Sequence, residues 1–180
     1  WGKKLKVSGS YFFNHTDNEN NSNIVRQYVT AADSGLVYNE SSLTNTRNMN
    51  HRVNGRLEYT IDSANSLIIT PRVSFQDNTY ERELSGDNRY GNNLLFSRTA
   101  NNNNAGNTGY NFSNNLLYRH KFAKKGRTVS ANLGTQLNKR TGDGELYSLN
   151  EFTDGDTTLL DQRYDLDANG YTLSGELRYT

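Results

Sequence analysis

The stretch RVNGRLEYTIDSANSLIITPRVSF, residues 52–75, decides the fold class of this chain. Apolar or small residues take every second position in residues 53–61 and again in residues 67–75. Successive side chains of a β-strand point to opposite faces, so each run predicts a strand with one apolar and one polar face. The short polar break Asp62–Ser66 between the two runs predicts a tight turn, and the whole stretch therefore predicts a β-hairpin.

The same alternation recurs along the rest of the chain and predicts six strands. Their expected ranges are 3–14, 52–62, 66–77, 109–122, 127–140 and 170–180.

The connections between these strands alternate between short and long. The breaks after residues 62 and 122 are only a few residues long, whereas the Asn-, Ser-, Thr- and Asp-rich stretches 15–50, 77–108 and 141–169 predict three long loops. A compact soluble domain rarely carries several structureless loops longer than about 15 residues, but outer-membrane barrels combine short periplasmic turns with long extracellular loops. The prediction is an all-β fold: an antiparallel meander of about six transmembrane strands that is part of a larger outer-membrane β-barrel.

Four residues interrupt the pattern. Asn114 falls on the apolar face of its strand, whereas Ile68 and Leu117 fall on the polar face. Pro71 lies inside a strand, where it removes a backbone donor, and it predicts a bulge or a local break.

The composition excludes several classes of protein. The 180 residues carry a net charge of +1, which gives no reason to expect a nucleic-acid partner. The chain has no Cys, which rules out a disulfide scaffold and Cys-based metal sites. It also has no apolar run of about 18 residues that would form a transmembrane helix. Because the chain opens at Trp1 without an initiator Met, we expect a segment of a longer protein.

The spacing of tyrosines on the apolar face fits a membrane. Tyr110 and Tyr118 lie eight residues apart, as do Tyr171 and Tyr179. Eight residues of strand rise about 26 Å, or about 20 Å along the membrane normal at a tilt of about 40°. Each pair, together with Tyr59, is therefore predicted to place aromatic rings at the lipid interfaces. The alternative is that Tyr is simply common in strands.

Residues with catalytic or metal-binding chemistry are sparse. Asp165-x-Asp167-x-Asn169-Gly170, with Glu176 six residues later, matches the calcium-loop pattern of the EF-hand and is the main metal-site candidate. A calcium ion bound in an external loop with help from Asp154, Asp156 or Asp161, and a site formed by His15 and His51 at the base of the first long loop, are the alternatives. An EF-hand needs a helix on either side, and residues 171–179 read as a strand, so the default is a turn in which Asp and Asn bind their own backbone. With no clustered nucleophile or acid–base set and no phosphate loop, we expect neither an enzyme nor a cofactor.

The strand-and-turn pattern resembles the barrel region of the TonB-dependent-receptor-like outer-membrane proteins of Bacteroidetes. The resemblance extends over most of residues 1–180. It is carried by Val53–Asp62, Ser66–Asp77, Gly109–Gly126, Arg127–Asn138 and Gly142–Phe152.

This resemblance implies a bacterial outer-membrane location, a barrel of 22 strands in the typical receptor, and an N-terminal plug domain that these 180 residues do not include. It implies uptake or transport of a nutrient or ligand. The implied partners are outer-membrane lipid, the remainder of the barrel and the plug, a TonB-type energy-coupling protein and a surface lipoprotein. Since single-chain barrels need at least about eight strands, six strands are expected to form one arc of the wall.

A second hypothesis belongs to another class: a soluble extracellular β-sheet module for binding or adhesion, without transport. Such a module would have to bury the apolar faces against each other, and the three long polar stretches would then have no explanation.

Overall fold

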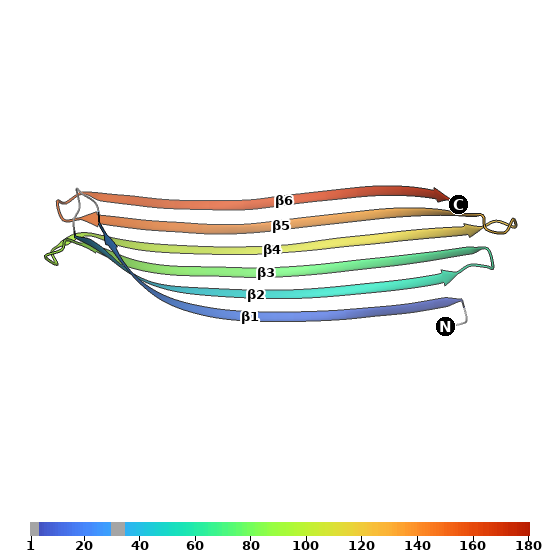
Figure 1. The fold of residues 1–180 in the computed structure, drawn as a ribbon, viewed down its shortest axis with the longest axis horizontal. Coiled ribbons are helices and arrows are strands. Elements are labelled where there is room, and N and C mark those ends of the chain that lie inside the picture. Colours follow the sequence, from blue (N-terminus) through green and yellow to red (C-terminus); the bar gives the residue numbers. More distant parts are fainter. Residues whose placement is uncertain (1–3, 30–34) are drawn as a thin grey trace.

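The computed structural model describes residues 4–29 and 35–180. They form one six-stranded antiparallel sheet in which the strands follow chain order (Figure 1). The strands are β1 (Leu5–Tyr28), β2 (Leu36–Thr60), β3 (Asn65–Arg89), β4 (Leu95–Lys121), β5 (Thr128–Phe152) and β6 (Thr157–Tyr179). The predicted all-β antiparallel meander of six strands is confirmed. The described residues contain no helix that is long and apolar enough to cross a membrane.

The strands meet at two ends of the sheet, which we call the proximal and distal edges. The proximal edge holds the turns 61–64 and 122–127, and the distal edge holds the turns 90–94 and 153–156. β1 begins and β6 ends at the proximal edge (Figure 1). Both proximal turns are short, as predicted, and each predicted strand ends within about two residues of the observed strand end there.

For the described residues, the prediction of three long loops at 15–50, 77–108 and 141–169 is wrong; residues 30–34 of the first stretch lie outside the described residues. The strands continue through most of these stretches, so that each strand is 23 to 27 residues long. At about 3.3 Å per residue, a strand of this length extends about 80 Å. The apolar alternation therefore marks only the proximal part of each strand, and the strand itself is about twice as long.

Cross-strand hydrogen bonds between polar side chains explain why these stretches are strands without apolar alternation. Thr108 and Thr141 hydroxyls lie 3.0 Å apart across β4 and β5, and the Thr99 hydroxyl donates to the Asn150 side chain at 2.7 Å. Directly opposed side chains of this kind stabilise a sheet by a few tenths of a kcal/mol to about 1 kcal/mol per pair. Because both faces are polar here, hydrophobic periodicity does not reveal the strands.

The distal turns are compact, and each is built by residues that favour turns. Asn93 adopts a φ of 67° and Gly155 a φ of 96°, the left-handed region that Gly and Asn occupy most readily. Side-chain oxygens of Asn92 and Asp154 accept hydrogen bonds from backbone N–H groups two residues on, at 3.2 and 3.1 Å. Asx turns of this kind are a sequence signal of tight hairpin turns, which makes the distal connections short.

The register gives the sheet two chemically different faces. One face carries the odd-numbered residues of β1, β2, β3, β5 and β6 and the even-numbered residues of β4, and we call it the banded face. The opposite face is called the amide face. Residues that oppose each other directly on neighbouring strands form rows across the sheet. Five consecutive rows of the banded face, from Leu5–Tyr59–Leu67–Tyr118–Ala131–Leu177 to Phe13–His51–Phe75–Tyr110–Lys139–Asn169, form what we call the apolar band.

The apolar band is nine residues tall along each strand and carries no carboxylate. As predicted, Asn114 lies within it, and its side-chain oxygen is buried without a hydrogen-bond partner. Ile68 and Leu117 lie on the amide face, where they oppose each other directly. These two exceptions to the alternation therefore form one apolar pair on an otherwise polar face.

The sheet has no hydrophobic core in the part of the chain that is described. No apolar side chain there is buried, and Val7, Leu173, Leu177 and Tyr171 are 68–83% exposed. The accessible surface is 12995 Å², whereas a compact monomer of 20.4 kDa exposes about 8,800 Å². The described strands β1 and β6 each pair on one side only, so both lateral edges of the sheet are open. A single open layer with an exposed apolar band calls for a partner on that face and at those edges.

Candidate functional site

The banded face brings the predicted interfacial tyrosines into two groups, one at each border of the apolar band. Tyr59 and Tyr118 lie in the proximal row of the apolar band, and Tyr179 lies one row nearer the proximal edge. Tyr110 lies in the distal row of the band and Tyr171 in the row next to it. The five side chains therefore mark the two borders of the band, at the separation that the eight-residue spacing predicts.

The distal border carries further aromatic residues that the sequence reasoning did not single out. His51 lies at the centre of this group, with ring centroids 4.7 Å from Phe13 and 6.3 Å from Phe75. The Tyr11 hydroxyl and Nδ1 of His51 form a hydrogen bond of 2.7 Å. The positions of Tyr11 and Phe13 in the alternation were visible in the sequence, but only the register shows that β1, β2 and β3 place them side by side.

The proximal border is tied to the β2–β3 turn. The Tyr118 hydroxyl donates to Oδ1 of Asn65 at 2.5 Å, and the His120 ring nitrogen Nδ1 lies 2.8 Å from the same oxygen. Phe122 packs edge-on against His120, with ring centroids 4.8 Å apart, and against Tyr179 at 6.0 Å. These contacts order a cluster of aromatic side chains at the point where the strands turn.

The calcium-loop candidate does not form a loop. Asp165, Asp167 and Asn169 lie at alternate positions of the continuous strand β6, on the banded face; Asn169 is in the distal row of the apolar band, and the two carboxylates lie beyond it. Asp165 opposes Asp143, and both line a shallow hollow of about 330 Å³ together with Asp77 and Asp167. Within residues 4–29 and 35–180 no group of three or more His, Asp or Glu side chains is arranged to hold a metal ion. The predicted turn is absent because β6 pairs with β5 throughout this stretch.

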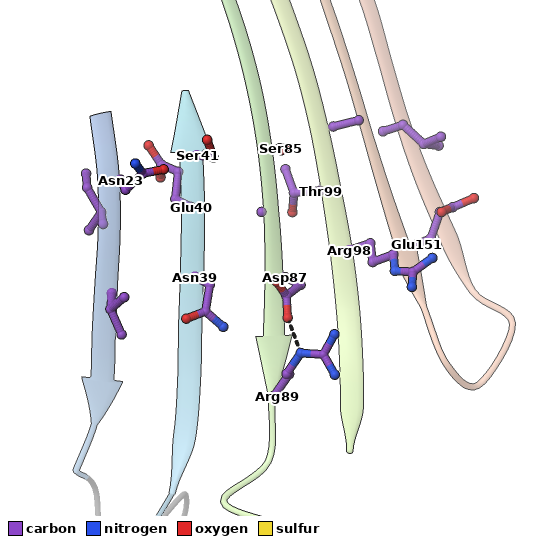
Figure 2. Close-up of a pocket in the computed structure, with 15 residues that line it drawn as sticks. Asn23, Asn39, Glu40, Ser41, Ser85, Asp87, Arg89, Arg98, Thr99 and Glu151 are labelled. Atoms are coloured by element: carbon purple, nitrogen blue, oxygen red, sulfur yellow. Dashed lines mark hydrogen bonds and ion pairs between the residues drawn. The ribbon is translucent and has the colours of Figure 1, made fainter. Parts of the chain in front are cut away.

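A larger hollow of about 630 Å³ lies at the distal edge (Figure 2). Its charged side chains alternate in sign: Arg98 of β4 opposes Asp87 of β3 on one side and Glu151 of β5 on the other. Arg89 also forms an ion pair with Asp87. Because these charges compensate one another, this hollow offers no strong preference for a ligand of either sign.

A largely buried acidic group, Glu40, also lines this hollow, from the amide face. The Glu40 side chain is 9% exposed, accepts a hydrogen bond from the Tyr38 hydroxyl at 2.9 Å and pairs with Arg82 at 3.2 Å. Burial of the phenol, followed by its hydrogen bond to the Glu40 carboxylate, raises the pKa of Tyr38 from 10.0 to about 12. The ion pair links β2 to β3, and together with the hydrogen bond from Tyr38 it satisfies the Glu40 carboxylate.

The centre of the amide face holds the hollow that we take as the candidate site, with a volume of about 580 Å³. Two guanidinium groups, Arg52 and Arg140, enter its lining from β2 and β5, and Gly109 lies between them on β4. Carboxamides of the amide face make up much of the rest of the lining: Asn50, Gln76, Asn78, Asn107, Asn111 and Asn138. Lys139 and Asn169, which belong to the banded face, also contribute to the lining. Amides both donate and accept hydrogen bonds, so this surface can bind water or hydroxyl groups in many orientations.

Comparison with protein-family models and with curated proteins finds no match to this chain. The function is therefore inferred from the chemistry of the two faces of the sheet and from the rows of residues across them.

Proposed function

We propose that this chain is an arc of the wall of an outer-membrane β-barrel of the TonB-dependent-receptor-like kind, and that the complete barrel takes up a nutrient or ligand across the outer membrane. One observation carries the proposal: a one-sided apolar band, bordered by aromatic rows, on a sheet whose described residues bury no apolar side chain.

The dimensions of the band support a membrane-spanning wall. Nine residues per strand match the 9–11 residues that a tilted strand needs to cross the hydrocarbon layer. The band contains no carboxylate, and Lys139 is the basic residue within it, in the distal border row. A charge at the border costs far less than a charge at the midplane of the bilayer.

The open edges of the sheet support an arc of a larger barrel. Six strands lie below the minimum of about eight for a single-chain barrel, and unpaired edges of 23 and 24 residues would template aggregation if nothing covered them. Further strands of the same barrel would pair with β1 and β6 and remove both edges. A plug domain, an energy-coupling protein and a surface lipoprotein are proposed partners that follow from the resemblance.

The strands beyond the band support a long extramembrane wall. The distal half of each strand lacks the apolar alternation and continues for about 40–50 Å past the band at about 3.3 Å per residue. In the proposed arrangement, the proximal turns face the periplasm and the distal turns face the outside of the cell.

Cysteine labelling of the complete protein tests this proposal, and these 180 residues contain no Cys that would interfere. Leu173→Cys lies in the apolar band and Thr172→Cys, the matched control, lies next to it on the amide face. We expect a lipid-soluble maleimide to label both and a charged, water-soluble maleimide to label only Thr172→Cys. Equal labelling of the two by the charged reagent would contradict a lipid-facing band and would favour a soluble binding module.

A second set of four sites tests the orientation. On intact cells, a membrane-impermeant thiol reagent is expected to label Cys at Asn92 and Asp156 in the distal turns but not at Ala64 and Lys125 in the proximal turns. The opposite pattern would reverse the orientation and leave the barrel wall intact.

A further inference from the structure

The charged residues of the strands are segregated between the two faces. The amide face carries ten basic residues against three acidic ones, a formal charge of +7, and the banded face carries five against twelve, a formal charge of −7. The basic residues of the amide face are Lys6, Arg26, Arg52, Arg56, Arg72, Arg82, Arg119, Lys121, Arg140 and Arg178. A net charge of +1 for the chain therefore conceals two strongly charged and opposite surfaces.

All three carboxylates of the amide face are already paired. Glu58 pairs with Arg56 at 2.7 Å, Glu176 with Arg178 at 2.7 Å, and Glu40 with Arg82 at 3.2 Å. Among the ion pairs of residues 4–29 and 35–180, none includes Arg52, Arg72 or Arg140. These three guanidinium groups carry positive charge that the described part of the sheet does not neutralise.

The three arginines lie together at the centre of the amide face. Arg52 and Arg140 line the hollow of about 580 Å³, and Arg72 lines a second hollow of about 390 Å³. The two hollows meet because the row of Arg72 and Ser113 directly follows the row of Arg52 and Asn111. Neither hollow has an Asp or Glu in its lining. The two hollows form one basic, amide-lined surface behind the middle and distal rows of the apolar band, and it continues just beyond the distal row at Arg140.

The chemistry of this surface fits a particular class of solute. Guanidinium groups bind carboxylate, sulfate and phosphate oxygens with two parallel hydrogen bonds. The surrounding carboxamides donate to and accept from hydroxyl groups. We propose that the amide face selects hydroxylated organic anions, with Arg52, Arg72 and Arg140 binding the oxyanion group. This inference rests on the proposed function, because a transported solute meets these residues only if the amide face lines the inside of the barrel.

The position behind the band strengthens the selection. A wall surrounded by low-dielectric lipid focuses the field of its charges into the water-filled side. Uncompensated cations at membrane depth are costly unless water or an anion solvates them, so an anionic solute there replaces a missing counter-ion. A neutral polyol makes the amide contacts alone.

Thiol chemistry measures this potential directly in the complete protein. Asn111→Cys lies on the strand between those of Arg52 and Arg140, in the candidate hollow, and Thr79→Cys lies in the acidic hollow of the banded face. The probes are a negatively charged sulfonatoethyl and a positively charged trimethylammonioethyl methanethiosulfonate. We expect the rate ratio of anionic to cationic reagent to be at least tenfold higher at residue 111 than at residue 79, and to decrease with added salt.

Charge variants assign the effect to these arginines. In the Asn111→Cys background, Arg52→Gln with Arg140→Gln is expected to lower the rate ratio at least fivefold. Arg47→Gln with Arg163→Gln removes two charges from the banded face and is expected to leave the ratio at residue 111 unchanged. Equal ratios at residues 111 and 79, or equal effects of the two double variants, would overturn the proposal.

Protection against labelling tests the solute class. At equal concentration, D-gluconate and D-glucose 6-phosphate are compared with the neutral polyol D-glucitol as protectants of Asn111→Cys. We expect protection by one or both anions and at least tenfold weaker protection by glucitol; the better anion identifies carboxylate or phosphate as the favoured group. Equal protection by all three, or none by either anion, would overturn the selection of anions. Because the proposed function is tested by maleimide labelling of Leu173 and Thr172, its failure is distinguishable from a failure here.

Discussion

The ring of Pro71 on β3 lies over Gly55 on β2. A Cβ atom at residue 55 would stand 3.0 Å from Cγ of Pro71, closer than a methyl group tolerates without displacement. The register between these strands passes from Asn54–Arg72 directly to Leu57–Ile69. The local break that Pro71 predicts is therefore confirmed as an interruption of pairing, and β3 continues through it because its other edge still pairs with β4.

Gly55 and Gly175 occupy the same place in two similar sequences, Val53-x-Gly55-x-Leu57-x-Tyr59 and Leu173-x-Gly175-x-Leu177-x-Tyr179. Gly55→Ala is expected to lower the free energy of unfolding by about 1–3 kcal/mol, because the added methyl displaces the Pro71 ring. Gly175→Ala is the control, since a Cβ there meets no atom of the described chain within 4 Å. Urea titration of the complete protein in lipid measures both, and an equal loss in the two variants would show that the Pro71 contact is not the cause.

Leu173 lies in the middle row of the apolar band, opposite Thr135. If lipid covers the band, Leu173→Lys is expected to cost about 2–4 kcal/mol of folding stability, the usual cost of a basic residue near the bilayer midplane. Thr172→Lys adds the same charge to the amide face and is expected to cost much less. Folding yield into liposomes measures the difference, and a tolerated Leu173→Lys would argue against lipid at this position.

Burial of Tyr38 and its hydrogen bond to Glu40 make the folding stability depend on pH in the alkaline range. Its folded pKa of about 12 lies above the ordinary value of 10.0, so the folded state retains the phenolic proton where the unfolded chain loses it. The stability that results is fully present below pH 10 and is lost as the pH rises from about 10 to about 12. Difference absorbance of tyrosinate between the wild type and Tyr38→Phe should show one group titrating near pH 12, and a titration near pH 10 would contradict the hydrogen bond to Glu40.

Asp62 organises the β2–β3 turn. Its Oδ1 accepts backbone hydrogen bonds from Ala64 at 2.7 Å and Asn65 at 2.8 Å. The Asn65 side chain, which also donates to both carboxylate oxygens, is the main cause that lowers the pKa of Asp62 below 3.8, with the Ala64 N–H next.

Because the folded pKa of Asp62 is lowered, its contribution to stability is present above about pH 4 and is lost as the pH falls through the folded pKa. Asp62→Ala is therefore expected to destabilise the protein at pH 7 and to differ less from the wild type in strong acid. Unfolding midpoints at pH 7 and below pH 3 measure this, and a difference that does not depend on pH would exclude the carboxylate as its origin.

The sequence by itself determined the strand class, the number of strands and the proximal hairpins. Alternation such as Val53 to Ile61 reports one apolar face, and Ala123–Gly126 and Asp62–Asn65 have the residues that tight turns need. It also placed Tyr59, Tyr118, Asn114 and Ile68 on their correct faces, because the period of a strand is two wherever one face is apolar.

The tertiary structure decided the lengths of the strands and the neighbours across them. Polar stretches such as Asn101–Asn104 have no apolar period, yet they pair in register because backbone hydrogen bonds and cross-strand polar contacts do not depend on hydrophobicity. Only the register brings Arg52 and Arg140, 88 positions apart, to one hollow and separates them from the carboxylates of the opposite face. Charge segregation is a property of paired strands, and a linear count of +1 cannot show it.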